Sequence, residues 1–148
     1  MNFKKALHEG CYSLHLESDT KDDIITEMVD ILVAENKVTD RDAALKAVFD
    51  REHKMSTGMQ CGVAIPHGKT TTVSGLYTVF AIKKEGVEFA SLDGQPASIF
   101  ILTLSSSNKT GQHMQYLSEI SKILNSESMR SKILAATTEE QLVELLSE

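Results

Sequence analysis

The middle of the chain carries three short apolar runs whose texture differs from that of the sequence on either side. These runs, at 61–65, 76–82 and 98–104, are rich in β-branched and aromatic residues, which is typical of strands buried on both faces of a sheet. Apolar residues at helical spacing precede the runs and follow them to the end of the chain. Strands enclosed between helical segments favour an α/β layered domain.

The composition of the 148 residues is that of an ordinary globular protein, with 41% hydrophobic and 24% charged residues. This length predicts one domain over residues 1–148. The net charge of −6, without a cluster of Lys and Arg, argues against nucleic acid or an anionic membrane as the main partner. The apolar runs are too short to span a bilayer, and the first residues lack the apolar stretch of a signal peptide, so we expect a cytoplasmic protein without membrane insertion.

Cysteine and histidine spacing gives no sign of a metal site. Cys11 and Cys61 show no Cys-x-x-Cys spacing, and we expect free thiols. His8 and His15 lie on either side of Cys11, but this spacing fits no compact metal motif. The segment 68–70 is similar to the end of a nucleotide-binding P-loop, yet the glycine that the motif needs five positions earlier is a valine, so we reject that match.

Polar clusters predict where several helices begin. Thr20 with Asp23 forms a capping-box pattern, and the cluster 39–42 repeats this start signal before a helix expected to end near 51–52. Thr137 is the expected N-cap of a last helix. The other elements that we expect are helices from 110 and over 127–134, and strands over 10–16 and 86–89.

The segment 62–68, Gly-Val-Ala-Ile-Pro-His-Gly, is the most informative part of the chain for function. Pro66 has no N–H to continue a ladder, so it suits the point where a strand leaves its sheet. Gly68 allows the backbone to turn and leaves room for a large group beside the ring of His67. His67 is either a histidine that satisfies a carbonyl at the end of a strand or a group that takes and gives a proton or a transferable group.

His113 is a second candidate, three residues after the expected helix start at Thr110. It shares a helical face with Leu117, Ile120 and Leu124, so it points toward the protein interior. Taken alone, the pattern favours a partly buried structural histidine. The start of a helix also attracts phosphate, however, and a histidine there can hold an anion attached to a neighbouring ring.

Three further residues have both a structural and a functional interpretation. Arg51 is either a helix-terminal cation or a fork-shaped donor for phosphate oxygens. Ser56 and Thr57 are either turn residues or hydroxyl donors near the same site. Their spacing leaves these alternatives open.

These residues together resemble the signature of a known family. Glu52, Met59 and 63–68 are similar to the active-site signature of the fructose, mannitol and nitrogen-type EIIA domains of the bacterial phosphotransferase system. The segment 111–117 resembles the second-histidine helix of that family, and 92–96 resembles the loop before its core strand. The resemblance extends over essentially the whole chain.

The resemblance implies a fold, a reaction and a site. The fold is α/β, with a mixed β-sheet of about five strands flanked by helices on both faces. His67 matches the histidine that accepts a phosphoryl group through Nε2 from the phosphocarrier HPr. His113 matches the second histidine, which steadies that group, and Arg51 matches an arginine near the site. The phosphoryl group then passes to a cysteine of an EIIB component, and no metal or organic cofactor is required.

The same resemblance allows two functions. The first is a phosphotransferase component that relays phosphate during fructose- or mannitol-type sugar uptake, and we prefer it. The second is a nitrogen-type regulator whose phosphorylation state controls binding to transporters or kinases. Gln60 stands where family members usually carry glycine or alanine, a change that can alter the fit of a partner. A histidine-dependent hydrolase is a weaker idea, because no nucleophile or metal set accompanies it.

Overall fold

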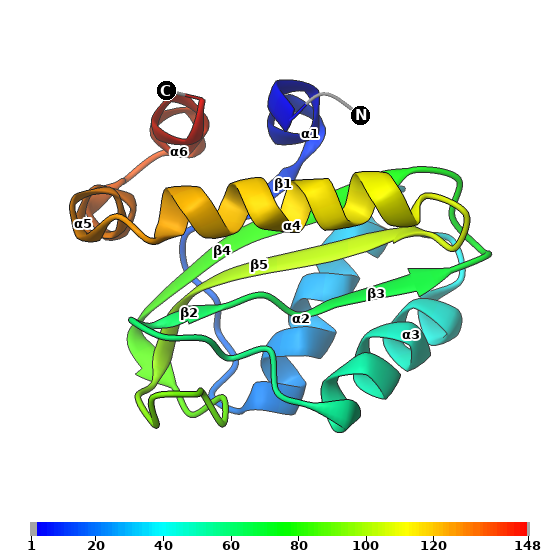
Figure 1. Ribbon diagram of the computed structural model, residues 1–148, viewed down its shortest axis with the longest axis horizontal. Coiled ribbons are helices and arrows are strands. Elements are labelled where there is room, and N and C mark those ends of the chain that lie inside the picture. Colours follow the sequence, from blue (N-terminus) through cyan, green and yellow to red (C-terminus); the bar gives the residue numbers. More distant parts are fainter. Residues whose placement is uncertain (1–2, 148) are drawn as a thin grey trace.

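The computed structural model describes residues 3–147, within which five strands form one sheet and six helices pack around it (Figure 1). The strands are β1 (Cys11–Ser13), β2 (Val63–Ala64), β3 (His67–Thr70), β4 (Leu76–Val87) and β5 (Ala97–Ser106). The helices are α1 (Phe3–Glu9), α2 (Lys21–Ala34), α3 (Arg41–Lys54), α4 (Thr110–Leu124), α5 (Glu127–Ala135) and α6 (Glu139–Leu146).

The centre of the sheet is the antiparallel pair of β4 and β5. The strands follow the order β1-β4-β5-β2, and β3 pairs with β5 further along the same edge as β2. β1 runs parallel to β4, whereas β2 and β3 run parallel to β5. This mixed sheet confirms the α/β architecture expected from the sequence. β4 also continues to Val87 through a register shift, so it includes the start of the separate strand expected at 86–89.

Helices cover both faces of the sheet (Figure 1). α2 and α3 pack on one face, where Phe100, Leu102 and Leu104 of β5 join their core. α1, α4, α5 and α6 pack on the other face, where Ile99 and Ile101 of the same strand contribute. Because β5 is buried on both sides, its sequence is a continuous apolar run instead of an alternating one.

Side-chain caps fix the starts of α2, α3 and α6 close to where the sequence predicts them. Thr20 caps α2, and Asp40 caps α3 from within the second predicted start cluster. Thr138 caps α6, so the prediction of Thr137 is wrong by one residue. The main-chain N–H of Thr137 instead donates to the side chain of Gln141, at 2.7 Å.

Two elements escape the sequence pattern, and a third is longer than expected. α1 buries only Ala6 and Leu7, which is too few for a helical period to be visible. β3 begins at His67 directly after Pro66, so the strand does not end at the proline but resumes beyond it along the same neighbour. α3 also continues past its expected end, to Lys54.

Candidate functional site

Two histidines from distant parts of the chain meet on one face of the sheet. His67 opens β3, and His113 lies in the first turn of α4. Their ring centroids are 5.4 Å apart, and the ring planes are inclined by 61°. Both histidines line one open pocket together with Arg51 and Gly68. The fold therefore gathers four of the residues that the sequence singles out.

His67 has one ring nitrogen engaged and the other open. Its Nδ1 lies 2.8 Å from the main-chain oxygen of Ile65. Because a carbonyl oxygen can only accept, Nδ1 carries the proton and donates this bond, and the neutral ring keeps its lone pair on Nε2. Burial lowers the pKa of His67, although the bond to Ile65 acts in the opposite direction. The ring is therefore neutral near neutral pH, with Nε2 available as a nucleophile.

His113 is fully buried and has one ring nitrogen without a partner. Its Nδ1 shares a hydrogen bond with the hydroxyl of Ser105 on β5. No residue among 3–147 hydrogen-bonds its Nε2. Burial, together with the positive charge of Lys69 and, in acid, that of protonated His67, lowers the pKa of His113 to about 4. A neutral ring with an unpaired nitrogen beside a nucleophile suits a ligand that brings its own oxygen atoms.

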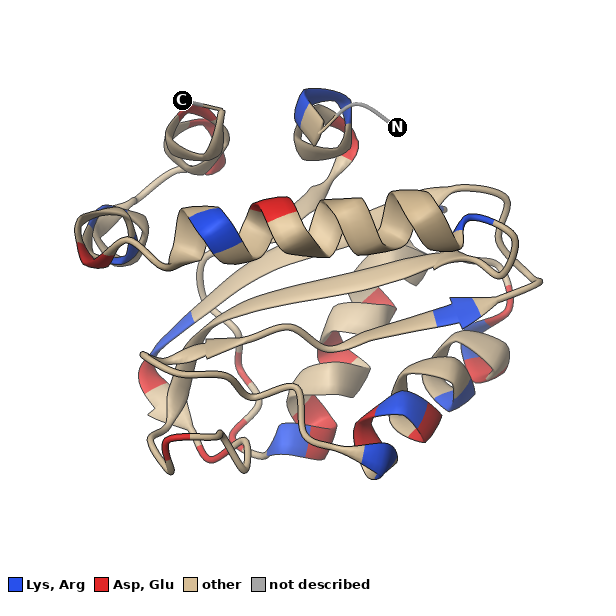
Figure 2. Cartoon of the chain, in the orientation of Figure 1, with Lys and Arg blue, Asp and Glu red and all other residues tan. Residues whose placement is uncertain are grey.

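Basic side chains line the pocket around the two histidines. Arg51 and Lys54 reach it from the end of α3, and Lys69 reaches it from β3, while Asp50 adds one acidic group. Nη1 of Arg51 donates to the carbonyl oxygen of Met55 at 2.7 Å, which ties the guanidinium to the loop after α3. Figure 2 shows basic positions on both α3 and β3, two of the elements whose residues line the pocket. The apolar residues of the lining include Ile65, Met114 and Leu117.

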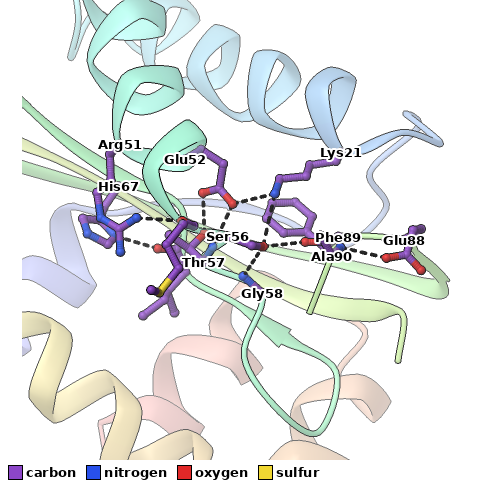
Figure 3. A network of polar contacts seen from close by, with 12 residues as sticks. Lys21, Arg51, Glu52, Ser56, Thr57, Gly58, His67, Glu88, Phe89 and Ala90 are labelled. Carbon is purple, nitrogen blue, oxygen red and sulfur yellow. Dashed lines mark hydrogen bonds and ion pairs between the residues drawn. The ribbon is translucent and has the colours of Figure 1, made fainter. Parts of the chain in front are cut away.

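Ser56 and Thr57 belong to a neighbouring polar network (Figure 3). The N–H and hydroxyl of Thr57 donate to the carboxylate of Glu52 at 2.8 and 2.7 Å. The hydroxyl of Ser56 donates to the carbonyl oxygen of Phe89 at 2.7 Å. Lys21 forms an ion pair with Glu52 at 2.8 Å. Both hydroxyls are therefore engaged inside the protein, and neither residue is among those that line the histidine pocket.

This network connects to His67 through the main chain. The carbonyl oxygen of Thr57 accepts the N–H of Ile65 at 3.0 Å, and the carbonyl oxygen of Ile65 holds Nδ1 of His67. Glu52, which is only 5% exposed, anchors Thr57 to the end of α3. Sequence reasoning missed this role of Glu52 and missed Lys21 entirely, because an acidic residue late in a helix and a lysine at the start of another are usually solvated.

Gly68 is needed for packing and not for a turn. A Cβ atom at this position would lie 2.8 Å from the carbonyl carbon of Ala47 and 2.9 Å from the main-chain nitrogen of Val48. Gly68 lies inside β3 and is not among the glycines with positive φ. The expectation that Gly68 turns the chain is therefore wrong. Its missing side chain lets α3, and with it Arg51, approach β3 closely.

Other sequence features take no part in the pocket. Within residues 3–147, no three His, Cys, Asp or Glu side chains gather as a metal site would require. Both thiols are free, with Cys11 buried and Cys61 exposed. None of the helices in this described range is both long and apolar enough to cross a bilayer.

The sequence matches a family model over nearly its whole length. Residues 5–148 match the model described as phosphoenolpyruvate-dependent sugar phosphotransferase system, EIIA 2. The fructose-specific EIIA component of Haloferax volcanii is 36% identical over 136 residues, covering 92% of this chain and 88% of that protein. The fructose-specific EIIABC component of Bacillus subtilis is 34% identical over 148 residues, but these are 100% of this chain and only 23% of that protein. The chain thus spans less than a quarter of the length of that relative.

Solved structures of related proteins share the fold. The nitrogen regulatory protein IIA-Ntr of Neisseria meningitidis superposes with a TM-score of 0.88 and 28% identity, over 97% of both chains. The mannitol enzyme IIA of Escherichia coli, solved in complex with phosphorylated mannitol enzyme IIB, gives a TM-score of 0.78 and 25% identity, over 92% of this chain and 93% of that one. These similarities confirm the family resemblance drawn from the site residues.

Proposed function

The chain belongs to the EIIA 2 family of the phosphoenolpyruvate-dependent sugar phosphotransferase system, and from this premise we propose that it carries a phosphoryl group on His67. It accepts this group from phospho-HPr and passes it to a cysteine of an EIIB component during fructose- or mannitol-type sugar uptake. The observation that carries the proposal is the arrangement of His67, whose Nδ1 is held by Ile65 while Nε2 remains open to the pocket.

The transfer needs no proton movement at His67. Nε2 attacks phosphorus in line with the leaving atom of the donor. The new N–P bond forms as the bond between phosphorus and the donor breaks, and the donor keeps the electron pair of that bond. Throughout this step Nδ1 keeps its proton and donates it in a hydrogen bond to the carbonyl oxygen of Ile65. The nucleophilic tautomer is therefore present before the donor arrives.

Donors around His67 stabilise the charge on the phosphoryl oxygens. His113 contributes Nε2, which has no partner within residues 3–147. Arg51 adds a guanidinium that is held in place through Met55. Positioned donors of this kind lower the barrier because they face the charge that develops in the transition state. In this proposal His67 carries the phosphoryl group, and His113 stabilises its charge during transfer.

Two protein partners must reach His67 in turn. The pocket is open, and Met114 at its rim is 58% exposed, which suits contact with a protein surface. The complex of the related mannitol enzyme IIA with phosphorylated enzyme IIB supports an EIIB acceptor for this chain as well. We place this relay in the cytoplasm and assign it to one domain over residues 1–148.

A regulatory role is the second candidate, and one similarity favours it. The structure of the nitrogen regulatory protein of Neisseria meningitidis is similar to this chain over 97% of both chains. In that role the same histidine is phosphorylated, but the result is phosphorylation-dependent binding to a transporter or a kinase. The acceptor distinguishes the two functions. Transfer to EIIB supports sugar uptake, and a phosphoryl group retained in the presence of EIIB supports regulation.

The test is phosphorylation with phosphoenolpyruvate, Enzyme I and HPr, followed by an assay of acid and base lability. We expect an acid-labile, base-stable phosphate on the wild-type protein and none on His67→Ala. His53→Ala is the matched control, because His53 is an exposed histidine on α3, outside the pocket lining, and its loss should leave labelling unchanged. Full labelling of His67→Ala, or no labelling of the wild type by active HPr, would overturn the assignment.

A further inference from the structure

The buried hydroxyl of Ser105 lies against the second histidine and not in the pocket. Ser105 is completely buried on β5, and its Oγ shares a hydrogen bond with Nδ1 of His113. Because Nδ1 is engaged in this way, Nε2 is the ring nitrogen of His113 that remains for a ligand. Whether that nitrogen carries a proton decides whether His113 attracts or repels a phosphoryl oxygen.

A neutral imidazole has a single N–H, so the two nitrogens of His113 compete for one proton. With the pKa of His113 at about 4, the ring is neutral at neutral pH. A proton on Nδ1 would leave a lone pair on Nε2, which repels the phosphoryl oxygens. A proton on Nε2 would make that nitrogen a donor to them. Only the second tautomer can assist transfer.

We propose that Ser105 is the positioning residue that selects this second tautomer. Its O–H donates to Nδ1 of His113, so the proton of the ring stays on Nε2 and is available to a phosphoryl oxygen on His67. The role rests on the proposed function of His67 as a phosphoryl carrier. Ser105 itself does not touch the phosphoryl group.

Within the described part of the chain, Ser105 is the side chain that hydrogen-bonds the ring of His113. The other titratable and charged side chains that line the pocket or act on His113 are His67, Lys69, Arg51, Lys54 and Asp50. No hydrogen bond joins any of them to His113 in the described part of the chain. The neighbouring Ser106 has a different partner, since its hydroxyl donates to the side-chain oxygen of Asn108 at 2.7 Å. Two adjacent serines on one strand therefore provide a test residue and its control.

The test combines Ser105→Ala with ¹⁵N spectroscopy of the histidine rings and with the rate of phosphoryl transfer from phospho-HPr. We expect the wild-type His113 to show the Nε2–H tautomer and Ser105→Ala to show a mixture of both tautomers. The maximal transfer rate should fall by about tenfold while the KM for phospho-HPr stays unchanged, because the lost contact is made in the transition state. Ser106→Ala should change neither the tautomer nor the rate. Ser105→Thr, which keeps a hydroxyl, should show the Nε2–H tautomer of the wild type.

The outcomes separate this role from the carrier function. An Nδ1–H tautomer in the wild-type protein would overturn the role of Ser105 without any variant being needed. An unchanged tautomer and rate in Ser105→Ala would also overturn it, while labelling of His67 would leave the carrier function intact. A wild-type protein that takes no phosphate from HPr would overturn the carrier function, and with it the role of Ser105 in transfer.

Discussion

The two histidines of the site differ in what faces Nδ1. At His67 this nitrogen meets a carbonyl oxygen, which can only accept a hydrogen bond. At His113 it meets the hydroxyl of Ser105, which can also donate one. On the proposed assignment, Nε2 of His67 consequently carries a lone pair, and Nε2 of His113 carries a proton. On this assignment, one histidine acts as the nucleophile and the other as a hydrogen-bond donor.

The low pKa of His113 predicts a loss of stability in acid. Folding holds this pKa at about 4, compared with 6.5 for the free ring, so between these values the unfolded chain binds more protons. The contribution to the free energy of unfolding is complete above pH 6.5 and is lost as the pH falls toward 4. It amounts to about 3 kcal/mol at most. Urea denaturation at steps of pH measures it.

The control for this prediction is His113→Gln, which keeps a polar group but cannot titrate. His67, whose pKa is also lowered, acts in the same direction, so the deciding quantity is the difference between the two proteins. We expect a flatter pH dependence for His113→Gln between pH 7 and pH 4. Parallel curves for the two proteins would show that His113 is not the group responsible.

For single residues, the sequence predicts the two histidines that meet in the pocket better than it predicts the residues that hold them. The segment around His67 singles out its ring, whereas the helical position of His113 alone favours a structural histidine, and the family resemblance pairs the two. Glu52 stands out only as part of the family signature, and Lys21 and Ser105 give no comparable signal, because the roles of all three depend on contacts between elements. Ser105 stands in a run of three serines, and nothing in that run shows which hydroxyl faces the helix.

The close contact of α3 with β3 depends on Gly68. A Cβ atom there would meet main-chain atoms of Ala47 and Val48, which cannot rotate away. We expect Gly68→Ala to lower the free energy of unfolding by about 2 kcal/mol, as overpacking of a core does. Because α3 also positions Arg51, phosphoryl transfer should slow in the same variant. Urea denaturation and the HPr transfer assay measure the two effects.

Gly111→Ala is the matched control for this change. A Cβ atom at Gly111 has nothing within 4 Å, and the residue lies in the first turn of α4. Alanine favours the helix over glycine, so the free energy of unfolding should rise by about 0.5 kcal/mol. If both variants were equally stable, steric contact with α3 would not be the reason for glycine at position 68.

The predicted elements are right where a local signal is strong. α2 combines a capping threonine with a long apolar stripe, and β5 is a long apolar run, so both are visible in the sequence. β3 is not, because its residues, His-Gly-Lys-Thr, have no strand-like pattern and are held by pairing with β5. Tertiary pairing overrides local propensity there.

The strand order lies beyond what the sequence indicates. Alternation and run length suggest that strands exist, but they do not show that β2 and β3 share one neighbour or that β1 pairs with β4. These pairings join segments that are far apart in the chain. The mixed character of the sheet was expected from the family resemblance and not from the pattern of residues.

The distribution of charge over the whole molecule predicts a salt-dependent reaction. The net charge is −6, yet Arg51, Lys54 and Lys69 line the pocket. The positive potential of these side chains attracts a phosphorylated donor, and salt weakens this attraction by screening the charges. We expect the association rate with phospho-HPr to fall with ionic strength. Lys54→Gln should slow association by about threefold at low salt and reduce the salt dependence.

Lys132→Gln provides the comparison, because it removes the same charge from α5, outside the lining of the histidine pocket. Stopped-flow kinetics over a range of salt concentrations would give both rates. Equal effects of the two variants would mean that total charge, and not the pocket, governs the encounter.

The position of β3 at the edge of the sheet has a consequence for local unfolding. β3 has β5 as its strand neighbour, whereas β5 is paired on both of its sides (Figure 1). Detaching β3 breaks one ladder of hydrogen bonds and its contact with α3, whereas detaching β5 dismantles the sheet. Amide protons of β3 therefore exchange with solvent through smaller openings than those of β5. We therefore expect the strand that carries His67 to open at a lower free energy than the centre of the sheet.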